Sequence, residues 1–359
     1  MRRSGGELWE GYPVDPIPPW LMPWAQEADL QIPANLKNNV VFLGVMEQKK
    51  FRPKATAFFV GFDTKFGGLL HLVTAEHVIV GLQLKGHKEV FVRTNIEGFP
   101  TTPLPLDKWT FHPDAERNPA DVAVIPITLL GTTKADFLVM QPEAFVTPKN
   151  IADREWGVGD EIVVIGLFRN HYGHTKNIPL VRIGSLAALP EEPVKTKWGF
   201  IEAYLIEMHS IGGLSGSPVY IHHPPFRITK DGKPQIIEGA RLNLLGIMQG
   251  HFDIPNLRED SIMEDDDDGE NGSINTGVGV VVPAHKILET LNHPDLVAER
   301  DTLQKRTERN AARLDFDDDD AHSSAASEVS VSDANPNHLK DFTRLVDVAA
   351  RKRPQGDQT

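Results

Sequence analysis

The sequence is broken into many short apolar segments, and this feature limits its fold more than any other. The segments are rich in Val, Ile and Phe, are bounded by Gly, Pro, Asp and Asn, and have almost no helical periodicity between them. They are residues 40–46, 56–62, 69–75, 89–94, 121–127, 161–168, 180–186, 200–208, 217–223, 243–250 and 277–284. Short runs of this kind predict β-strands. So many of them within roughly 250 residues predict an all-β domain, either a sandwich or barrels.

The two ends of the chain differ in composition from this strand-rich part. In residues 1–33, Trp9, Trp20 and Trp24 lie among prolines, which predicts an extended or polyproline-like arm. The aromatic side chains of the arm either pack on the main domain or dock on a protein partner. The main domain is expected to span residues 34–295.

The C-terminal part, residues 296–359, is expected to be a charged and mostly disordered tail. It follows a predicted helix at 284–291, contains the acidic run 317–320 and is poor in Leu, Val, Phe and Ile. Within it, residues 338–353 carry apolar side chains at helical spacing. This possible short helix either has no role or docks on a protein partner.

The composition excludes several classes of protein. The chain has 359 residues, no cysteine and a formal net charge of −13. Without cysteine there are no disulfides, thiolate metal sites or iron–sulfur clusters. The negative charge argues against a nucleic-acid binder. Because no apolar run is long enough to span a membrane or to form a signal peptide, we expect a cytoplasmic protein that binds no membrane.

An acidic run lies inside the strand-rich part, at residues 259–273, and is too charged to be buried. Its acidic residues do not follow the spacing of an EF-hand calcium loop. We interpret it as a solvated loop, and we expect neither a metal nor a cofactor.

Three polar residues lie beside apolar segments in settings that suit acyl transfer. This chemistry needs a hydroxyl nucleophile, an imidazole base, a carboxylate that orients the imidazole, and hydrogen-bond donors for the oxyanion. His77 follows one predicted strand and Asp121 opens another. Ser215 lies between Gly213 and Gly216, which permit a tight turn whose amides point at one spot. The amides of Gly213 and Ser215 are therefore the expected oxyanion donors.

These segments resemble the motifs of the trypsin-like (chymotrypsin-fold) serine peptidases. TAEH at 74–77 is similar to the T-A-x-H motif of the family, DVAV at 121–124 to its D-[IL]-A-[VL] motif, and GLSGSP at 213–218 to its G-x-S-G-[GS]-P motif. The order His, Asp, Ser is also that of the family. The resemblance covers residues 36–293. The lack of cysteine makes the chain most similar to bacterial members, such as glutamyl endopeptidases and HtrA protease domains.

The resemblance implies two six-stranded antiparallel β-barrels with a C-terminal helix and disordered tails. It implies a serine endopeptidase whose substrate is a protein or peptide and which needs no cofactor. Ser215 would be the nucleophile, His77 the general base, and Asp121 the carboxylate that orients the imidazole. The alternative is a catalytically weak peptide-binding or regulatory protein of the same fold.

Two positions depart from the pattern of the family. Val78 stands where secreted relatives have a cysteine, which fits a reducing compartment. Leu214 stands where zymogen-activated relatives have an Asp that pairs with a newly cut N-terminus. Because a leucine cannot make that ion pair, the resemblance implies activity without proteolytic activation.

The resemblance also implies where the primary specificity pocket lies. Its walls are expected at His209 and Ser210 on one side and at Gln249, Gly250 and His251 on the other. No Asp or Glu stands at the position that selects Lys or Arg, so a basic preference is disfavoured. Two histidines and a serine suit an acidic side chain, whereas histidines that point elsewhere leave a pocket for small or apolar ones. The acidic loop would lie over this cleft, either as a gate or as a passive insertion.

Overall fold

The computed structural model describes residues 32–62, 69–95, 101–114, 116–127, 137–196, 199–208, 213–224, 226–228, 231–236, 242–255 and 273–320. The chain divides into two compact units. The smaller unit contains a hairpin of β14 (Phe226–Ile228) and β15 (Pro234–Ile236), and the larger unit contains all the other described strands and helices. The predicted arm before Ile32 and the predicted helix at 338–353 lie outside the described residues. No helix within the described ranges is long and apolar enough to cross a membrane.

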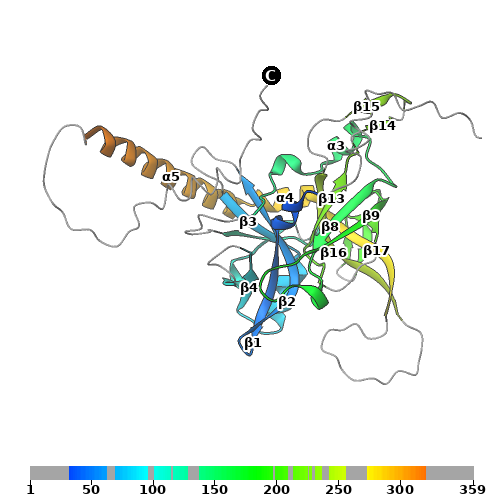
Figure 1. The fold of residues 1–359 in the computed structure, drawn as a ribbon, viewed down its shortest axis with the longest axis horizontal. Coiled ribbons are helices and arrows are strands. Elements are labelled where there is room, and N and C mark those ends of the chain that lie inside the picture. The colour runs from blue at the N-terminus through cyan, green and yellow to red at the C-terminus, as the bar shows by residue number, and fades with distance from the viewer. Residues whose placement is uncertain are drawn as a thin grey trace, which may run out of the picture. The chain divides into compact units, whose positions relative to one another are not determined.

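The N-terminal half is a seven-stranded antiparallel sheet (Figure 1). Its strands pair in the order β5-β4-β1-β2-β3-β7-β6. They are β1 (Val40–Glu47), β2 (Lys50–Phe62), β3 (Leu69–Thr74), β4 (Glu89–Arg93), β5 (Thr102–Pro105), β6 (Thr110–Phe111) and β7 (Ala123–Ile127). The sequence predicted a closed six-stranded barrel here. The sheet differs because β5 and β6, which the apolar pattern did not predict, form its two edges and do not pair with each other in the described part of the chain.

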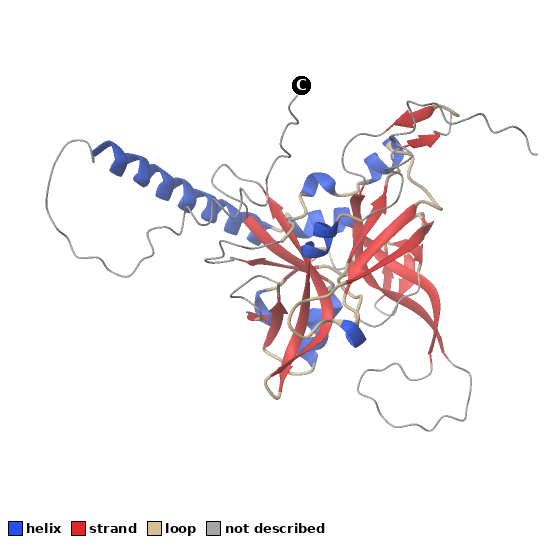
Figure 2. Ribbon diagram, in the orientation of Figure 1, coloured by secondary structure: helices blue, strands red, loops and turns tan. Residues whose placement is uncertain are grey.

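The C-terminal half is a closed six-stranded antiparallel barrel. Its strands are β8 (Glu161–Gly166), β9 (Leu180–Ala188), β12 (Tyr204–Glu207), β13 (Pro218–His222), β16 (Leu242–Pro255) and β17 (Ser273–Pro283), and a small hairpin of β10 (Val194–Thr196) and β11 (Gly199–Ile201) precedes β12. Each apolar segment that predicted a strand contains one, and strands dominate the structure (Figure 2). The predicted all-β class is therefore confirmed.

The two halves have separate apolar cores. Phe59, Leu72 and Ile125 lie in the core of the sheet. Tyr204 and Met248 lie in the core of the barrel. The helices are short or lie outside these cores. They are α2 (Glu76–Leu84), α3 (Pro148–Asp153), α4 (Ala284–Leu291) and α5 (Pro294–Asp320), with 3₁₀ turns η1 (Ala34–Asn39), η2 (Leu106–Lys108), η3 (Pro142–Ala144) and η4 (Arg169–His171).

Helix α5 occupies residues where the sequence predicted the start of a disordered tail. The segment is poor in apolar residues, but its many Glu, Arg, Lys, Ala and Leu residues are strong helix formers. Its first turns are packed against the rest of the unit. Leu296 is buried, and the Arg300 guanidinium lies 4.6 Å from the centroid of the Phe62 ring. Helix propensity and these two contacts explain why a second helix, α5, follows α4.

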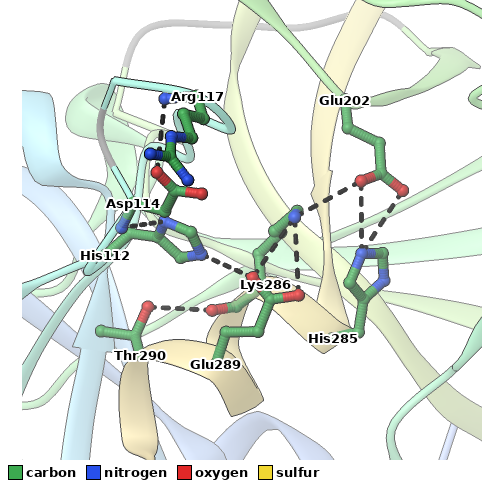
Figure 3. A network of polar contacts seen from close by, with 8 residues as sticks. All are labelled: His112, Asp114, Arg117, Glu202, His285, Lys286, Glu289 and Thr290. Atoms are coloured by element: carbon green, nitrogen blue, oxygen red, sulfur yellow. Dashed lines mark hydrogen bonds and ion pairs between the residues drawn. The ribbon is translucent and has the colours of Figure 1, made fainter. Parts of the chain in front are cut away.

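A polar network fixes α4 against its neighbours (Figure 3). Lys286 on α4 is 1% exposed, and its Nζ atom lies 3.5 Å from an oxygen of Glu202 and 3.3 Å from an oxygen of Glu289. The Nε2 atom of His112 lies 2.7 Å from Glu289, and that of His285 lies 3.3 Å from Glu202. A buried ammonium group is costly unless it is paired. These contacts therefore hold α4 to the loop after β6 and to the residues before β12.

One buried asparagine links the sheet to the barrel. Asn39, at the end of η1, is fully buried. Its Nδ2 donates to the carbonyls of Phe59 and Leu138, both at 2.8 Å. Its Oδ1 accepts a hydrogen bond from the hydroxyl of Tyr220 on β13 at 3.1 Å. A single amide thus satisfies polar groups of both halves.

Replacing this amide should destabilise the fold. In Asn39→Leu, the carbonyls of Phe59 and Leu138 and the hydroxyl of Tyr220 each lose one hydrogen bond, so the free energy of unfolding should fall by about 3 kcal/mol. Tyr220→Phe removes one of the three bonds and should cost about 1 kcal/mol. Urea unfolding followed by tryptophan fluorescence measures both changes. If Asn39→Leu unfolds at the midpoint of the unmodified protein, the link does not stabilise the fold.

Candidate active site

The pairing of β3 with β7 brings His77 and Asp121 together. In this pair Thr74 lies opposite Ala123, so His77, the second residue of α2, lies close to Asp121, two residues before β7. The Nδ1 atom of His77 lies 2.6 Å from Oδ2 of Asp121, and the backbone N–H of His77 donates to Oδ1 at 2.8 Å. An ionised carboxylate only accepts hydrogen bonds. Asp121 therefore fixes both the orientation of the imidazole and a tautomer with its proton on Nδ1.

The loop that carries Ser215 depends on glycine at two positions. Gly213 and Gly216 have φ angles of +102° and +81°, which residues other than glycine rarely adopt. A Cβ atom on Gly216 would lie 2.2 Å from the Thr56 carbonyl oxygen and 2.3 Å from Oγ1 of Thr74. Gly216 therefore packs directly on the end of β3, just before the turn that carries His77. The structure brings the predicted serine loop and the predicted histidine turn side by side.

A residue that the sequence did not single out, Thr56 on β2, binds this loop. Its backbone N–H donates to the carbonyl of Ser215 at 3.0 Å, and its hydroxyl donates to the carbonyl of Gly213 at 3.0 Å. The same hydroxyl accepts from the N–H of Leu167 at 2.9 Å, and the Thr56 carbonyl accepts from the Thr74 hydroxyl at 2.8 Å. Thr56 stands in an ordinary strand pattern, so no local signal could have identified it.

The backbone contacts of the loop bear on the predicted oxyanion donors. Thr56 donates hydrogen bonds to the carbonyls of Gly213 and Ser215, and these bonds fix the backbone of both residues. The N–H of Ser217 closes a tight turn onto the carbonyl of Leu214 at 2.9 Å. The role of the Gly213 and Ser215 amides as oxyanion donors stays a prediction.

The predicted specificity pocket is only partly within the described residues. His209 and Ser210 lie outside them. Gln249, Gly250 and His251 lie on β16, as expected from the sequence, and the Ser215 hydroxyl donates to the Gln249 carbonyl at 3.2 Å. The Gln249 side chain is buried, and its amide nitrogen has no hydrogen-bond partner among the described residues. The preference of the pocket stays a prediction.

The carboxyl group of Glu76 lies beside the His77–Asp121 pair and is half-buried. Burial, together with the negative charge of Asp121, raises the pKa of Glu76 to about 7, although His77 opposes this shift. The site therefore contains a second carboxyl group that ionises near neutral pH. The described residues hold no cluster of three or more His, Asp or Glu side chains suited to a metal ion. Most of the acidic run 259–273 lies outside those residues.

Comparisons with known proteins assign the chain to no family. No family model matches the sequence, and no curated protein matches it. The apo MamO protease domain from Magnetospirillum magneticum is similar at 16% identity, covering 72% of this chain and 99% of that one, with a TM-score of 0.41. Deg5 is similar at 16% identity, covering 71% of this chain and 87% of that one, with a TM-score of 0.38. Identities and TM-scores of this size assign no family. The topology itself, a closed six-stranded barrel beside an antiparallel sheet, is that of a trypsin-like fold.

The raised pKa of Glu76 should make the stability of the fold depend on pH. The folded protein retains the Glu76 proton up to about pH 7, whereas the unfolded chain releases it at lower pH, so stability falls as pH rises between these values. Glu76→Gln has no carboxyl group to ionise at this position, so its stability does not show this fall with pH. The melting temperature of the variant should therefore exceed that of the unmodified protein at pH 8 and match it at pH 4.

Glu116→Gln, at an exposed position, is the matched control for the loss of one carboxylate. Scanning calorimetry at the two pH values makes the comparison. A Glu76→Gln difference that is the same at pH 4 and pH 8 would show that burial does not shift this carboxyl group.

Proposed function

We propose that the chain is a serine endopeptidase that acts through His77, Asp121 and Ser215. One observation carries the proposal: Asp121 receives two hydrogen bonds from His77, and the loop of Ser215 packs on the strand end that leads into His77. An oriented imidazole next to a serine on a glycine-rich turn is the arrangement that acyl transfer requires.

In the proposed reaction, Ser215 Oγ attacks the carbonyl carbon of the peptide bond while Nε2 of His77 takes the hydroxyl proton. Asp121 stays ionised and stabilises the imidazolium. The amides of Gly213 and Ser215 donate to the oxyanion. His77 then protonates the leaving amine, and a water molecule deprotonated by the same imidazole hydrolyses the acyl-enzyme.

The hydrogen bond of the Ser215 hydroxyl distinguishes two candidate functions. The hydroxyl donates to the Gln249 carbonyl, so catalysis requires it to rotate toward His77 when substrate binds. Catalytic hydrogen bonds often tighten only in the substrate complex. A serine held permanently on Gln249 would instead favour the second candidate, a peptide-binding or regulatory protein with little hydrolytic activity.

Two further features support a peptidase that needs no proteolytic activation and that acts in a reducing compartment. Leu214 is buried in the core of the barrel, so this position offers no carboxylate for a newly formed N-terminus. The chain also lacks cysteine, which suits the reducing cytoplasm as the proposed location. The proposed substrate is a protein or peptide.

Removal of the proposed nucleophile or base should abolish activity without unfolding the protein. Ser215→Ala and His77→Ala should each lower kcat by about 10⁴- to 10⁶-fold, because the three residues act as a unit. A fluorophosphonate probe should label the unmodified protein on Ser215, as read by mass spectrometry of its peptides. Both variants should fail to label.

Ser217→Ala is the matched control, because Ser217 is two residues away and its buried hydroxyl has no hydrogen-bond partner in the described part of the chain. It should label at the rate of the unmodified protein. An unmodified protein that is folded and does not label supports the binding protein over the peptidase. A Ser215→Ala variant that keeps a tenth of the turnover would refute the assigned roles.

A further inference from the structure

The segment between β8 and β9 connects the serine loop to the end of β4 in the N-terminal sheet. At its start, the N–H of Leu167 donates to the Thr56 hydroxyl, which itself binds the Gly213 carbonyl. The side chain of Leu167 also lies against Gly213, where a Cβ atom would be 3.1 Å from its Cδ2. Arg169 lies nearly as close, with its Cγ 3.3 Å from the same point. This end of the segment therefore touches the backbone of the serine loop.

At its other end, the segment is attached to β4 by Asn177. This residue is 3% exposed, and its side chain both accepts from Nε of Arg93 at 2.6 Å and donates to the Arg93 carbonyl at 2.5 Å. Its backbone N–H donates to Oδ1 of Asn95, and its carbonyl accepts from Nδ2 of Asn95 at 3.1 Å. Two hydrogen bonds to Arg93 and two to Asn95 thus fix Asn177 to the end of β4. If Asn177 moved relative to this strand, few of its new positions would keep all four bonds.

Among the residues that the structure describes, the Arg93 side chain is held by neutral acceptors and aromatic rings. It is 8% exposed, and its described contacts are two neutral acceptors, Asn177 and the Tyr172 carbonyl at 2.9 Å, and three aromatic rings. The centroids of the rings of Tyr172, Phe51 and Phe42 lie 5.0, 5.1 and 5.8 Å from its guanidinium carbon. A guanidinium is stabilised by aromatic faces and by acceptors that match its planar geometry. A buried cation held in this way tolerates little displacement of the segment that provides its partners.

We propose that Arg93 and Asn177 are positioning residues for the proposed peptidase. They fix the far end of the segment 167–178, so that Leu167 is pressed against Gly213 and the serine loop keeps the orientation that its amides need. The inference rests on the proposed function. It adds a set of contacts, remote from the reacting atoms, on which the reactivity of Ser215 depends.

The test compares Asn177→Ala with Asn150→Ala. Asn150 also makes side-chain hydrogen bonds with backbone groups, those of Thr147 and Phe145, but it lies at the start of α3 and not in the segment. The second-order rate of fluorophosphonate labelling at 25 °C should fall by about 10- to 100-fold in Asn177→Ala, since small displacements of reacting groups have effects of this size. Asn150→Ala should label at the unmodified rate. Asn177→Asp keeps an acceptor for Arg93 and should recover most of the rate, which a purely structural role would not require.

Hydrogen exchange separates this inference from the proposed function. Amides of residues 213–217 should exchange faster in Asn177→Ala than in Asn150→Ala, whether or not Ser215 reacts. If the unmodified protein does not label, the proposed function fails while the exchange result still tests the connection. If Asn177→Ala is folded, labels at the unmodified rate and exchanges normally at 213–217, the positioning role is wrong. Should Asn177→Ala not fold, the labelling rate and the exchange at 213–217 are measured instead in Asn177→Asp and Asn177→Ser. Equal rates and equal exchange in these two variants would overturn the need for the Arg93 acceptor.

Discussion

The loop that carries Ser215 is held by a residue of the other half of the fold, Thr56. Its N–H and its hydroxyl each bind a carbonyl of the loop at 3.0 Å, and its own carbonyl binds the end of β3. Because β3 leads into His77, one buried residue sets the serine loop against the strand that presents the base. Hydrogen bonds of this kind are individually worth about 1 kcal/mol, but leaving such buried groups unpaired costs more. Few arrangements of the loop therefore satisfy them all.

This constraint matters because the proposed catalytic residues come from two β-structures with separate cores. Hydrophobic burial stabilises the sheet and the barrel separately, but it is not directional and does not fix one against the other. The chain has no cysteine, so no disulfide can do so. Buried polar contacts perform this task instead: Asn39 with Tyr220, Thr56 with the serine loop, and Arg93 with Asn177. The geometry of the site is thus a property of the contact between the halves.

Sequence reasoning can propose site residues where the information is local. His77, Asp121 and Ser215 each stand next to an apolar strand segment, and the structure brings the His77 turn, Asp121 and the serine loop together. It failed where the information lies in distant pairs. Thr56 and Asn177 look like ordinary strand and loop residues, and their partners lie far away in the chain. The tail composition also hid α5, whose start depends on propensity and on the contact of Arg300 with Phe62.

We propose that Ser215, His77 and the amides of the loop form one reactive site, and a crystal structure of the protein after treatment with a fluorophosphonate can test this. We expect phosphorus bonded to Ser215 Oγ, with the phosphonyl oxygen about 2.7–3.1 Å from the amide nitrogens of Gly213 and Ser215. An unmodified Ser215 still bound to the Gln249 carbonyl, or an adduct whose oxygen points away from both amides, would contradict it.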